Sequence, residues 1–196
     1  QGDTGAQYEL GNAYRTGEGV AKDEKEAVKW YRKAANQANT EAQVALGRCY
    51  EKGEGVEKDL EEAVEWFKKA AEHGFEPAMN ALGECYAVGG DGVAKDLAEA
   101  LLWFRKAADQ GNAAAQVNMG LAYEKGEGVA KSMKEAAQWY QKAAEQGNAD
   151  GQYHLGVCHE KGEGVQKNLK EAIRLYREAG DQGDANAQKA LKALGK

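Results

Sequence analysis

Proline and serine are almost absent from this chain of 196 residues, which contains one of each, Pro77 and Ser132. A single proline leaves no proline-rich linker, and a lone serine offers little material for serine-based catalysis. No apolar run is long enough to cross a bilayer, so direct membrane insertion is not expected. The net charge of −6 is small and its signs are interleaved, which gives no basic patch of the kind that binds nucleic acid.

The sequence does contain one motif, Leu-Gly-x-x-Tyr, which is repeated at a nearly constant interval. Successive copies are separated by 36, 36, 37 and 36 residues. A fixed period of this size is typical of stacked supersecondary units that bury their apolar faces against one another. The five copies begin at Leu10, Leu46, Leu82, Met119 and Leu155, and the last has His159 in place of tyrosine.

Each unit is predicted to consist of two helices. In the second unit, Ala42, Leu46, Cys49 and Tyr50 have the spacing of one apolar helical face, which predicts a first helix over residues 40–52. The glycine after the motif leucine is costly in the middle of a helix. Because all five units keep this glycine, we expect another helix to pass too close for a Cβ atom.

A Gly-Glu-Gly-Val loop joins the two helices in four of the units. Its first glycine suits the left-handed residue that ends a helix, and its valine is expected to fill the space beneath the loop. The second helix opens with a capping box, in which the cap side chain and a glutamate three residues later each accept a backbone N–H. The five pairs are Asp23 with Glu26, Asp59 with Glu62, Asp96 with Glu99, Ser132 with Glu135, and Asn168 with Glu171.

The ends of the units complete the predicted organisation. A glycine follows the second helix in four units, whereas Ala38 stands there in the first, at a cost of about 1 kcal/mol if its conformation is left-handed. Residues 184–194 are predicted to form one further copy of a unit's first helix, with no second helix after it. Lys192 replaces the motif glycine there, as suits a terminal cap. We therefore expect a single array over residues 1–196, with repeats at about 3–38, 39–74, 75–111, 112–147 and 148–183 and a capping helix at 184–195.

The assembled pattern resembles the Sel-one-like repeat (SLR) family, a relative of the tetratricopeptide repeat. The resemblance rests on Ala-Gln-x-x-Leu-Gly-x-x-Tyr, the Gly-Glu-Gly-Val loop and Ala-x-x-Trp-Tyr/Phe-x-Lys-Ala-Ala, and it covers essentially the whole chain. It implies an all-α, right-handed α/α superhelical solenoid that acts as a scaffold or adaptor, without substrate or cofactor. Family members occur in several compartments, so the resemblance assigns none. The chain lacks the paired cysteines of the family's cysteine-rich secreted branch.

The three cysteines, Cys49, Cys85 and Cys158, all occupy one repeat position, which Ala13 and Ala122 fill in the other units. A position shared by cysteine and alanine indicates a small buried packing residue. Equivalent atoms in stacked units lie roughly 10 Å apart, whereas a disulfide needs Cα atoms within about 7 Å. We therefore predict three free thiols.

Candidate chemistry is sparse. His154 and Cys158 are one helical turn apart and could form half of a zinc site, but no second pair is visible. His73 stands where other units have glutamine near the end of the second helix, and this indicates a cap. Catalysis needs a unique constellation of residues, whereas the acidic loop residues recur in every unit. The sequence thus indicates no catalytic residue, no metal site and no cofactor.

A partner surface is predicted on the first helices, which line the concave surface in tetratricopeptide-like superhelices. The residues beside the motif leucine's face differ from unit to unit, as a tuned binding surface would. The second half of the set is apolar, and exposed apolar area marks interaction sites. The candidate residues are Tyr8, Asn12, Arg15, Val44, Arg48, Glu51, Asn80, Glu84, Val117, Leu121, Glu124, Tyr153, Val157 and Glu160.

The function expected from the sequence is therefore a non-enzymatic, monomeric scaffold or adaptor that binds a protein or peptide along the concave first-helix surface. One alternative is a structural repeat segment of a larger multidomain protein, because the chain begins close to its first motif. A less favoured alternative is a hydrolase or cell-wall-active enzyme, for which the sequence shows no cluster of acid, base and nucleophile.

Overall fold

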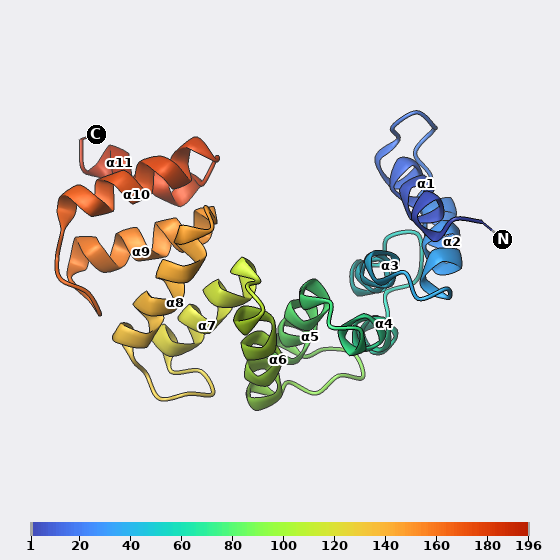
Figure 1. Ribbon diagram of the computed structural model, residues 1–196, viewed down its shortest axis with the longest axis horizontal. Coiled ribbons are helices and arrows are strands. Elements are labelled where there is room, and N and C mark those ends of the chain that lie inside the picture. Colours follow the sequence, from blue (N-terminus) through green and yellow to red (C-terminus); the bar gives the residue numbers. More distant parts are fainter. Residues whose placement is uncertain (1, 196) are drawn as a thin grey trace. The chain divides into compact units, whose positions relative to one another are not determined.

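The computed structural model describes residues 2–195, which contain eleven α-helices and no β-strand (Figure 1). The all-α repeat fold predicted from the sequence is confirmed, with two helices in each of five units and one further helix. The helices are α1 Thr4–Thr16, α2 Glu24–Ala35, α3 Thr40–Lys52, α4 Leu60–Glu72, α5 Glu76–Val88, α6 Leu97–Asp109, α7 Ala113–Lys125, α8 Met133–Glu145, α9 Ala149–Lys161, α10 Leu169–Asp181 and α11 Ala185–Ala193.

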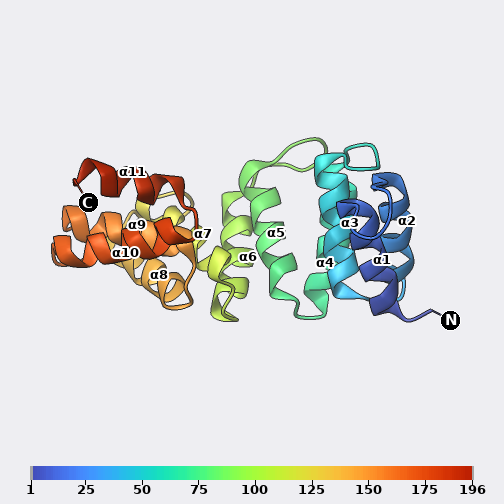
Figure 2. The same ribbon diagram turned by 90° about the horizontal axis from the view of Figure 1, so that it is seen from above.

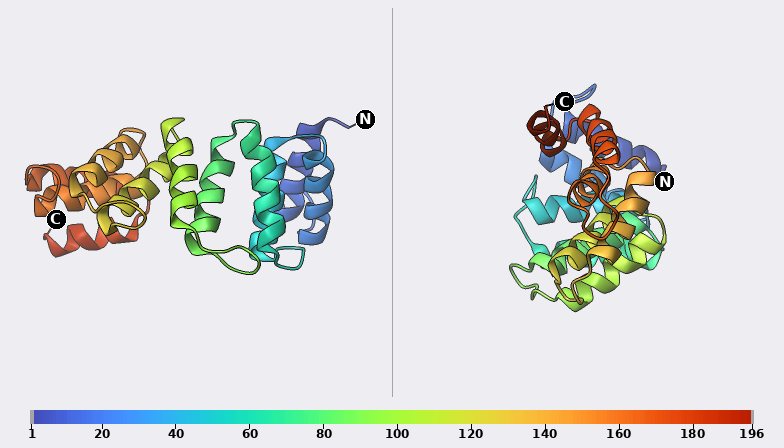
Figure 3. Two further views of the ribbon diagram at one scale, coloured as in Figure 1. Left: turned by 90° about the horizontal axis from the view of Figure 1, so that it is seen from below. Right: turned by 90° about the vertical axis from the view of Figure 1, so that its left-hand side faces the viewer.

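The helices group into two compact parts, an N-terminal half up to residue 100 and a C-terminal half from residue 101. In the N-terminal half, α1 packs on α2, α2 on α3, α3 on α4 and α4 on α5 (Figure 2). In the C-terminal half, the same order runs from α7 to α11, and α7 also contacts α9 (Figure 3). Each half is thus a stack in which every helix buries its apolar face against its neighbours along the chain.

Gly11, Gly47, Gly120 and Gly156 lie against aromatic rings of a neighbouring helix, so the close helix approach predicted at these motif glycines is confirmed. A Cβ atom built on Gly47 would lie 2.5 Å from Cε1 of Phe67, and one on Gly120 would lie 2.4 Å from Cε1 of Tyr140. Each ring comes from the second helix of the same unit and is fully buried. The glycine therefore lets the two helices of a unit approach until ring and backbone are in contact.

The capping boxes are only half formed. Each cap side chain accepts the predicted N–H bond, as Asp59 does from Glu62 at 3.0 Å. The cap's own N–H, however, donates to the carbonyl of the motif tyrosine, from Asp59 to Tyr50 at 2.9 Å, and not to the glutamate. Because the loop brings the end of the first helix to the cap, a backbone bond replaces the side-chain bond. Glu62 is left to accept from Nε1 of Trp66 at 2.9 Å.

The two loop glycines serve different purposes. The first, Gly53 in the second unit, ends the helix at φ +77°, as predicted. The second permits contact between units, because a Cβ atom on Gly55 would lie 2.2 Å from the carbonyl oxygen of Glu24. The turn of the second unit therefore rests on the start of the first unit's second helix, and Gly164 in the fifth unit meets the backbone of Met133 in the same way. Val56, next to Gly55, packs on the first unit's core cluster, as expected for a residue beneath the loop.

Ala38 is the one residue other than glycine with a positive φ in the described chain, at +62°, whereas Gly74 and Gly147 occupy this position at +78° and +79°. We expect Ala38→Gly to stabilise the protein by about 1 kcal/mol, since a left-handed alanine costs about that much more than glycine. Urea unfolding, followed by the circular dichroism signal of the helices, measures the change in the free energy of unfolding. An unchanged or lower unfolding midpoint would contradict the assigned strain.

The last helix, α11, packs on α10 through the fully buried Ala187 and through Leu191 and Leu194. Lys192, at the position of the motif glycine, is exposed. The helix has nine residues, whereas the first helices of the five units have thirteen. It therefore acts as the predicted cap, but it covers α10 over a shorter length than a complete first helix would.

Candidate functional site

The candidate partner-binding residues lie on α1, α3 and α5 in the N-terminal half and on α7 and α9 in the C-terminal half. Most are partly buried, and Arg15 is exposed. Two are not available to a partner, because Asn80 and Val117 are only 6% and 7% exposed. Val117 belongs to the core cluster of Tyr140 and Leu155, so the expectation that it forms apolar surface was wrong.

The candidates of the N-terminal half form a network of charged groups. Arg48 on α3 donates to Glu51 at 2.8 Å and reaches α5, where it pairs with Glu84 at 2.8 Å. The other carboxylate oxygen of Glu84 accepts from Nδ2 of Asn80 at 2.7 Å. The guanidinium of Arg48 also lies 5.5 Å from the ring centre of Phe67. These groups link the adjacent first helices α3 and α5 and present a polar surface. The other candidates in this half are Tyr8, Asn12 and Val44.

The residue after the motif tyrosine (or after His159 in the fifth unit) forms a hydrogen bond with a tyrosine hydroxyl on the second helix of its own unit where that helix carries one. Glu124 accepts from the hydroxyl of Tyr140 at 2.6 Å, and Glu160 accepts from the hydroxyl of Tyr176 at 2.6 Å. In the first unit, Arg15 and Asn12 contact the hydroxyl of Tyr31. In the second unit the aromatic residue is Phe67, which has no hydroxyl, and Glu51 pairs with Arg48 instead. Part of the variation between units therefore satisfies internal partners.

Burial raises the pKa of Tyr140 and Tyr176, and the adjacent Glu124 and Glu160 raise each pKa further. Both hydroxyls consequently stay protonated and keep donating to the carboxylates. Each glutamate is held in a fixed orientation on the first-helix face. The C-terminal half thus presents two positioned acceptor groups beside its apolar residues.

An apolar and aromatic surface lies on α7 and α9, which contact each other. We define the α7–α9 patch as Leu121, Tyr153, His154 and Val157, all partly buried. The His154 ring stacks on Tyr140 at 4.8 Å between ring centres, and Tyr153 meets its edge at 5.2 Å. Sequence reasoning assigned His154 only to half of a metal site and missed its place here. The sequence did contain a sign of this role, because His154 directly follows Tyr153 and faces the aromatic residues of α8.

The stability of the C-terminal half is expected to fall as the pH drops below about 6.5. Burial lowers the pKa of His154 from its ordinary value of 6.5, against the attraction of Glu124, Asp150 and Asp184, and Lys125 lowers it further. The unfolded chain then takes up a proton at a higher pH than the folded one, and stability is lost between the two pKa values. Unfolding midpoints at pH 7.5 and 5.5 should differ less in His154→Asn, which copies Asn118. Equal pH dependence would contradict the assignment.

The remaining candidate chemistry is accounted for by packing. Cys49, Cys85 and Cys158 are free and buried, as predicted, and burial raises their pKa to about 11, 12 and 11. Protonated buried thiols are poor nucleophiles. Ser132 caps α8, and the exposed His73 is the C-cap residue of α4.

Residues 2–195 contain neither a metal-binding cluster nor a membrane-spanning helix. No group of three or more His, Cys, Asp or Glu side chains is placed to hold a metal ion. No helix in the described chain has the length and apolar character of a membrane span.

Comparison with known proteins identifies the repeat. The Sel1 repeat model matches residues 4–39, 40–75, 76–112, 113–148 and 149–184. A Sel1 repeat protein from Oxalobacter formigenes is 40% identical over 98% of this chain and 78% of its own, with a TM-score of 0.91. The protective antigen c5321, which is present in uropathogenic Escherichia coli strains and displays an SLR fold, is 39% identical over 97% of this chain, with a TM-score of 0.84.

The relatives differ in length from this chain. It spans 41% of the length of c5321. Helicobacter pylori cysteine-rich protein B is 28% identical over 68% of this chain and 96% of its own, with a TM-score of 0.54. No protein with curated function matches the sequence.

Proposed function

The chain belongs to the Sel1 repeat family, whose members are generally protein-interaction scaffolds, and from this premise we propose that it binds a peptide or protein segment on the α7–α9 patch. The observation that carries the proposal is the position of Leu121 and Val157, directly after the motif glycines. The equivalent residues in the N-terminal half are polar or charged, namely Asn12, Arg48 and Glu84. Leu121 packs on the core cluster of Tyr140 and Val157 on that of Tyr176, but both stay partly exposed, and this apolar surface is what we propose a partner covers.

The charges around the patch favour a particular kind of partner. Glu124 and Glu160 lie on the same helices, each with one carboxylate oxygen bonded to a tyrosine hydroxyl. Asp150 and Asp184 act electrostatically on His154, and Lys125 opposes them. We propose that the partner segment carries apolar side chains next to lysine or arginine. The polar first-helix face of the N-terminal half is proposed to add contacts, and no catalytic role is included.

The test is capture of partners by the double variant Leu121→Glu/Val157→Glu. Glu84 shows that the repeat accepts glutamate at this position, so the variant should keep its helical content. We expect at least a tenfold loss of capture, since two carboxylates replace the apolar anchors. Leu102→Glu is the matched control, because Leu102 is 57% exposed on α6 of the same half. Equal capture by the double variant and wild type would refute the proposal.

A further inference from the structure

A small cavity of about 230 Å³ lies in the N-terminal half, bounded by the ends of α3 and α5, the start of α4 and the turn after α5. Leu60 and Cys85 form an apolar wall and are only 8% and 3% exposed. Val88, the last residue of α5, also lines the cavity and is 78% exposed. The cavity therefore opens to solvent beside an apolar side chain that the fold leaves uncovered.

The cavity belongs to the unit whose sequence departs most clearly from the repeat. The turn after α5 has one residue more than the other turns, and it keeps an acidic residue, Asp91. The third unit ends its first helix in Val88, whereas the second, fourth and fifth units end theirs in lysine, at Lys52, Lys125 and Lys161. This unit thus retains the acidic residue of the turn but not the lysine that precedes the turn elsewhere.

The charged groups at the cavity carry an excess of negative charge. The lining contains three carboxylates, from Glu51, Glu84 and Asp91, and one cation, Lys58. Arg48 adds a second cation and is paired with Glu51 and Glu84, at 2.8 Å in each case. Neither Asp91 nor Lys58 forms an ion pair within residues 2–195. Three carboxylates therefore face two cations, and the carboxylate of Asp91 has no partner of its own.

The thiol of Cys85 indicates the sign of the electrostatic potential at the apolar wall. Burial raises its pKa to about 12, Glu51 and Glu84 raise the pKa further, and Arg48 lowers it. Glu51 affects the thiol more strongly than Arg48 does, so the two carboxylates together outweigh the guanidinium. A negative potential at this wall stabilises a positively charged group in the cavity.

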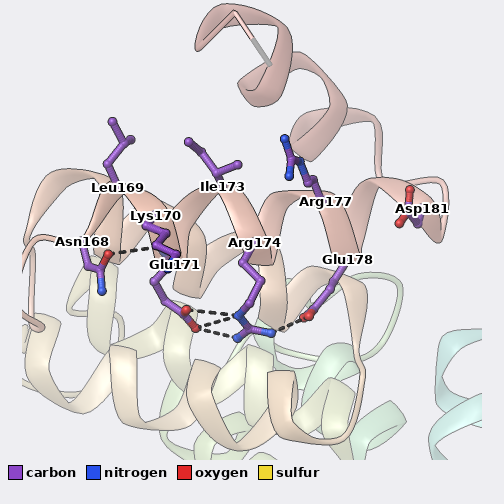
Figure 4. A pocket seen from close by; sticks show the side chains of 9 residues that line it. All are labelled: Asn168, Leu169, Lys170, Glu171, Ile173, Arg174, Arg177, Glu178 and Asp181. Carbon is purple, nitrogen blue, oxygen red and sulfur yellow. Dashed lines mark hydrogen bonds and ion pairs between the residues drawn. The ribbon is translucent and has the colours of Figure 1, made fainter.

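The larger groove on α10, of about 790 Å³, has no such excess (Figure 4). Arg174 lies there between Glu171 and Glu178 and is paired with both. Two further cations and one further carboxylate complete the charged lining of that groove. Its positive and negative groups are thus equal in number, and the uncompensated carboxylate distinguishes the cavity at the end of α5.

We propose that this cavity binds a lysine side chain presented by a partner segment. The ammonium group takes the place of the lysine that the third unit lacks, near Asp91 and the carboxylate oxygen of Glu51 that does not bond to Arg48. The aliphatic stem of the lysine lies along Val88 and Leu60. The proposal rests on the proposed function for the source of the lysine, and it names the group that the N-terminal half contacts.

The probe is a synthetic pentapeptide, acetyl-Ala-Ala-Lys-Ala-Ala-amide, titrated into the isotope-labelled full chain. Saturable amide shifts are expected at residues 84–92 and near residues 51 and 58, with a Kd on the order of 1 mM. The same peptide with norleucine keeps the aliphatic stem but lacks the ammonium group. It should bind about threefold more weakly, because a partly exposed ion pair contributes that much.

Two variants of the protein test the cavity, and both leave the repeat intact. Val88→Lys copies the lysine of the other units at an exposed position, and its own ammonium group should weaken peptide binding about fivefold. Asp91→Asn removes the unpaired carboxylate and should weaken binding about threefold. Glu54→Gln is the matched control, because Glu54 is the acidic turn residue of the second unit and does not line the cavity. It should leave binding unchanged.

Three results would overturn the proposal. The first is the absence of saturable shifts at residues 84–92, and the second is equal binding of the peptide by wild type and Val88→Lys. The third is tighter binding of free n-butylammonium than of the lysine peptide, which would make the cavity a site for a small amine. The double variant Leu121→Glu/Val157→Glu should bind the peptide like wild type, so failure at the cavity is distinguished from failure at the α7–α9 patch.

Discussion

Replacing Gly164 by alanine is expected to destabilise the C-terminal half by about 3 kcal/mol, the sum of a left-handed alanine and an overpacked contact. Gly164 has φ +76°, and its Cβ would lie 2.0 Å from the carbonyl oxygen of Met133 and 2.9 Å from the backbone nitrogen of Lys134. Backbone atoms cannot move aside as the end of a side chain can. The turn must therefore lift from α8, and the contact between the fourth and fifth units is lost.

Gly147→Ala is the matched control for this prediction. Gly147 has φ +79°, and a Cβ there would meet nothing within 4 Å. Alanine at this position should cost about 1 kcal/mol from the backbone conformation alone. Urea unfolding followed by circular dichroism gives both free energies. Equal costs at the two glycines would show that the turn does not need to touch the preceding helix.

Replacing Gly120 by alanine should destabilise the protein by about 2 kcal/mol, even though alanine is the better helix former by about 1 kcal/mol. The new Cβ would lie 2.4 Å from Cε1 and 2.6 Å from Cδ1 of Tyr140. That ring is fully buried and stacks on His154, so it cannot turn away freely. The overlap therefore outweighs the gain in helix propensity.

Gly180→Ala should have the opposite sign. Gly180 lies in α10, where Ala35, Ala71, Ala108 and Ala144 occupy the equivalent positions. The nearest atom to its Cβ would be Cγ of Gln188 at 3.3 Å, on a flexible side chain. The variant should gain up to about 1 kcal/mol from helix propensity. Thermal or urea unfolding of both variants decides the matter, and a stabilising Gly120→Ala would contradict the close approach.

Features fixed by one residue and its local conformation could be predicted from the sequence. Gly47 and Gly120 predicted close helix approach, and Ala38 predicted a left-handed residue, because each concerns a position that recurs in every unit. The free thiols followed from the repeat position of Cys49 and its equivalents in the same way. Because each such position recurs in several repeats, comparing the repeats shows which residue types it accepts, and this indicates its environment without a structure.

Features that depend on contacts between helices could not be predicted in this way. The bond from the Asp59 N–H to Tyr50 competes with the capping box, and only the path of the loop decides between them. Val117 was assigned to the surface because helical spacing gives a direction but not the depth of the neighbouring helix. The pair of Glu124 and Tyr140 spans 16 residues. The sequence contained only an indirect sign of this pairing: the second unit has Phe67 in place of the tyrosine, and there Glu51 pairs with Arg48 instead.

The three buried thiols make the protein its own reporter of local unfolding. A protonated, buried cysteine reacts with a thiol reagent only after its surroundings open, so its labelling rate measures an opening equilibrium. Cys49 and Cys85 sit in the N-terminal half and Cys158 in the C-terminal half, all at one position of the repeat. Differences in their labelling rates therefore compare how readily individual units open, without any introduced probe.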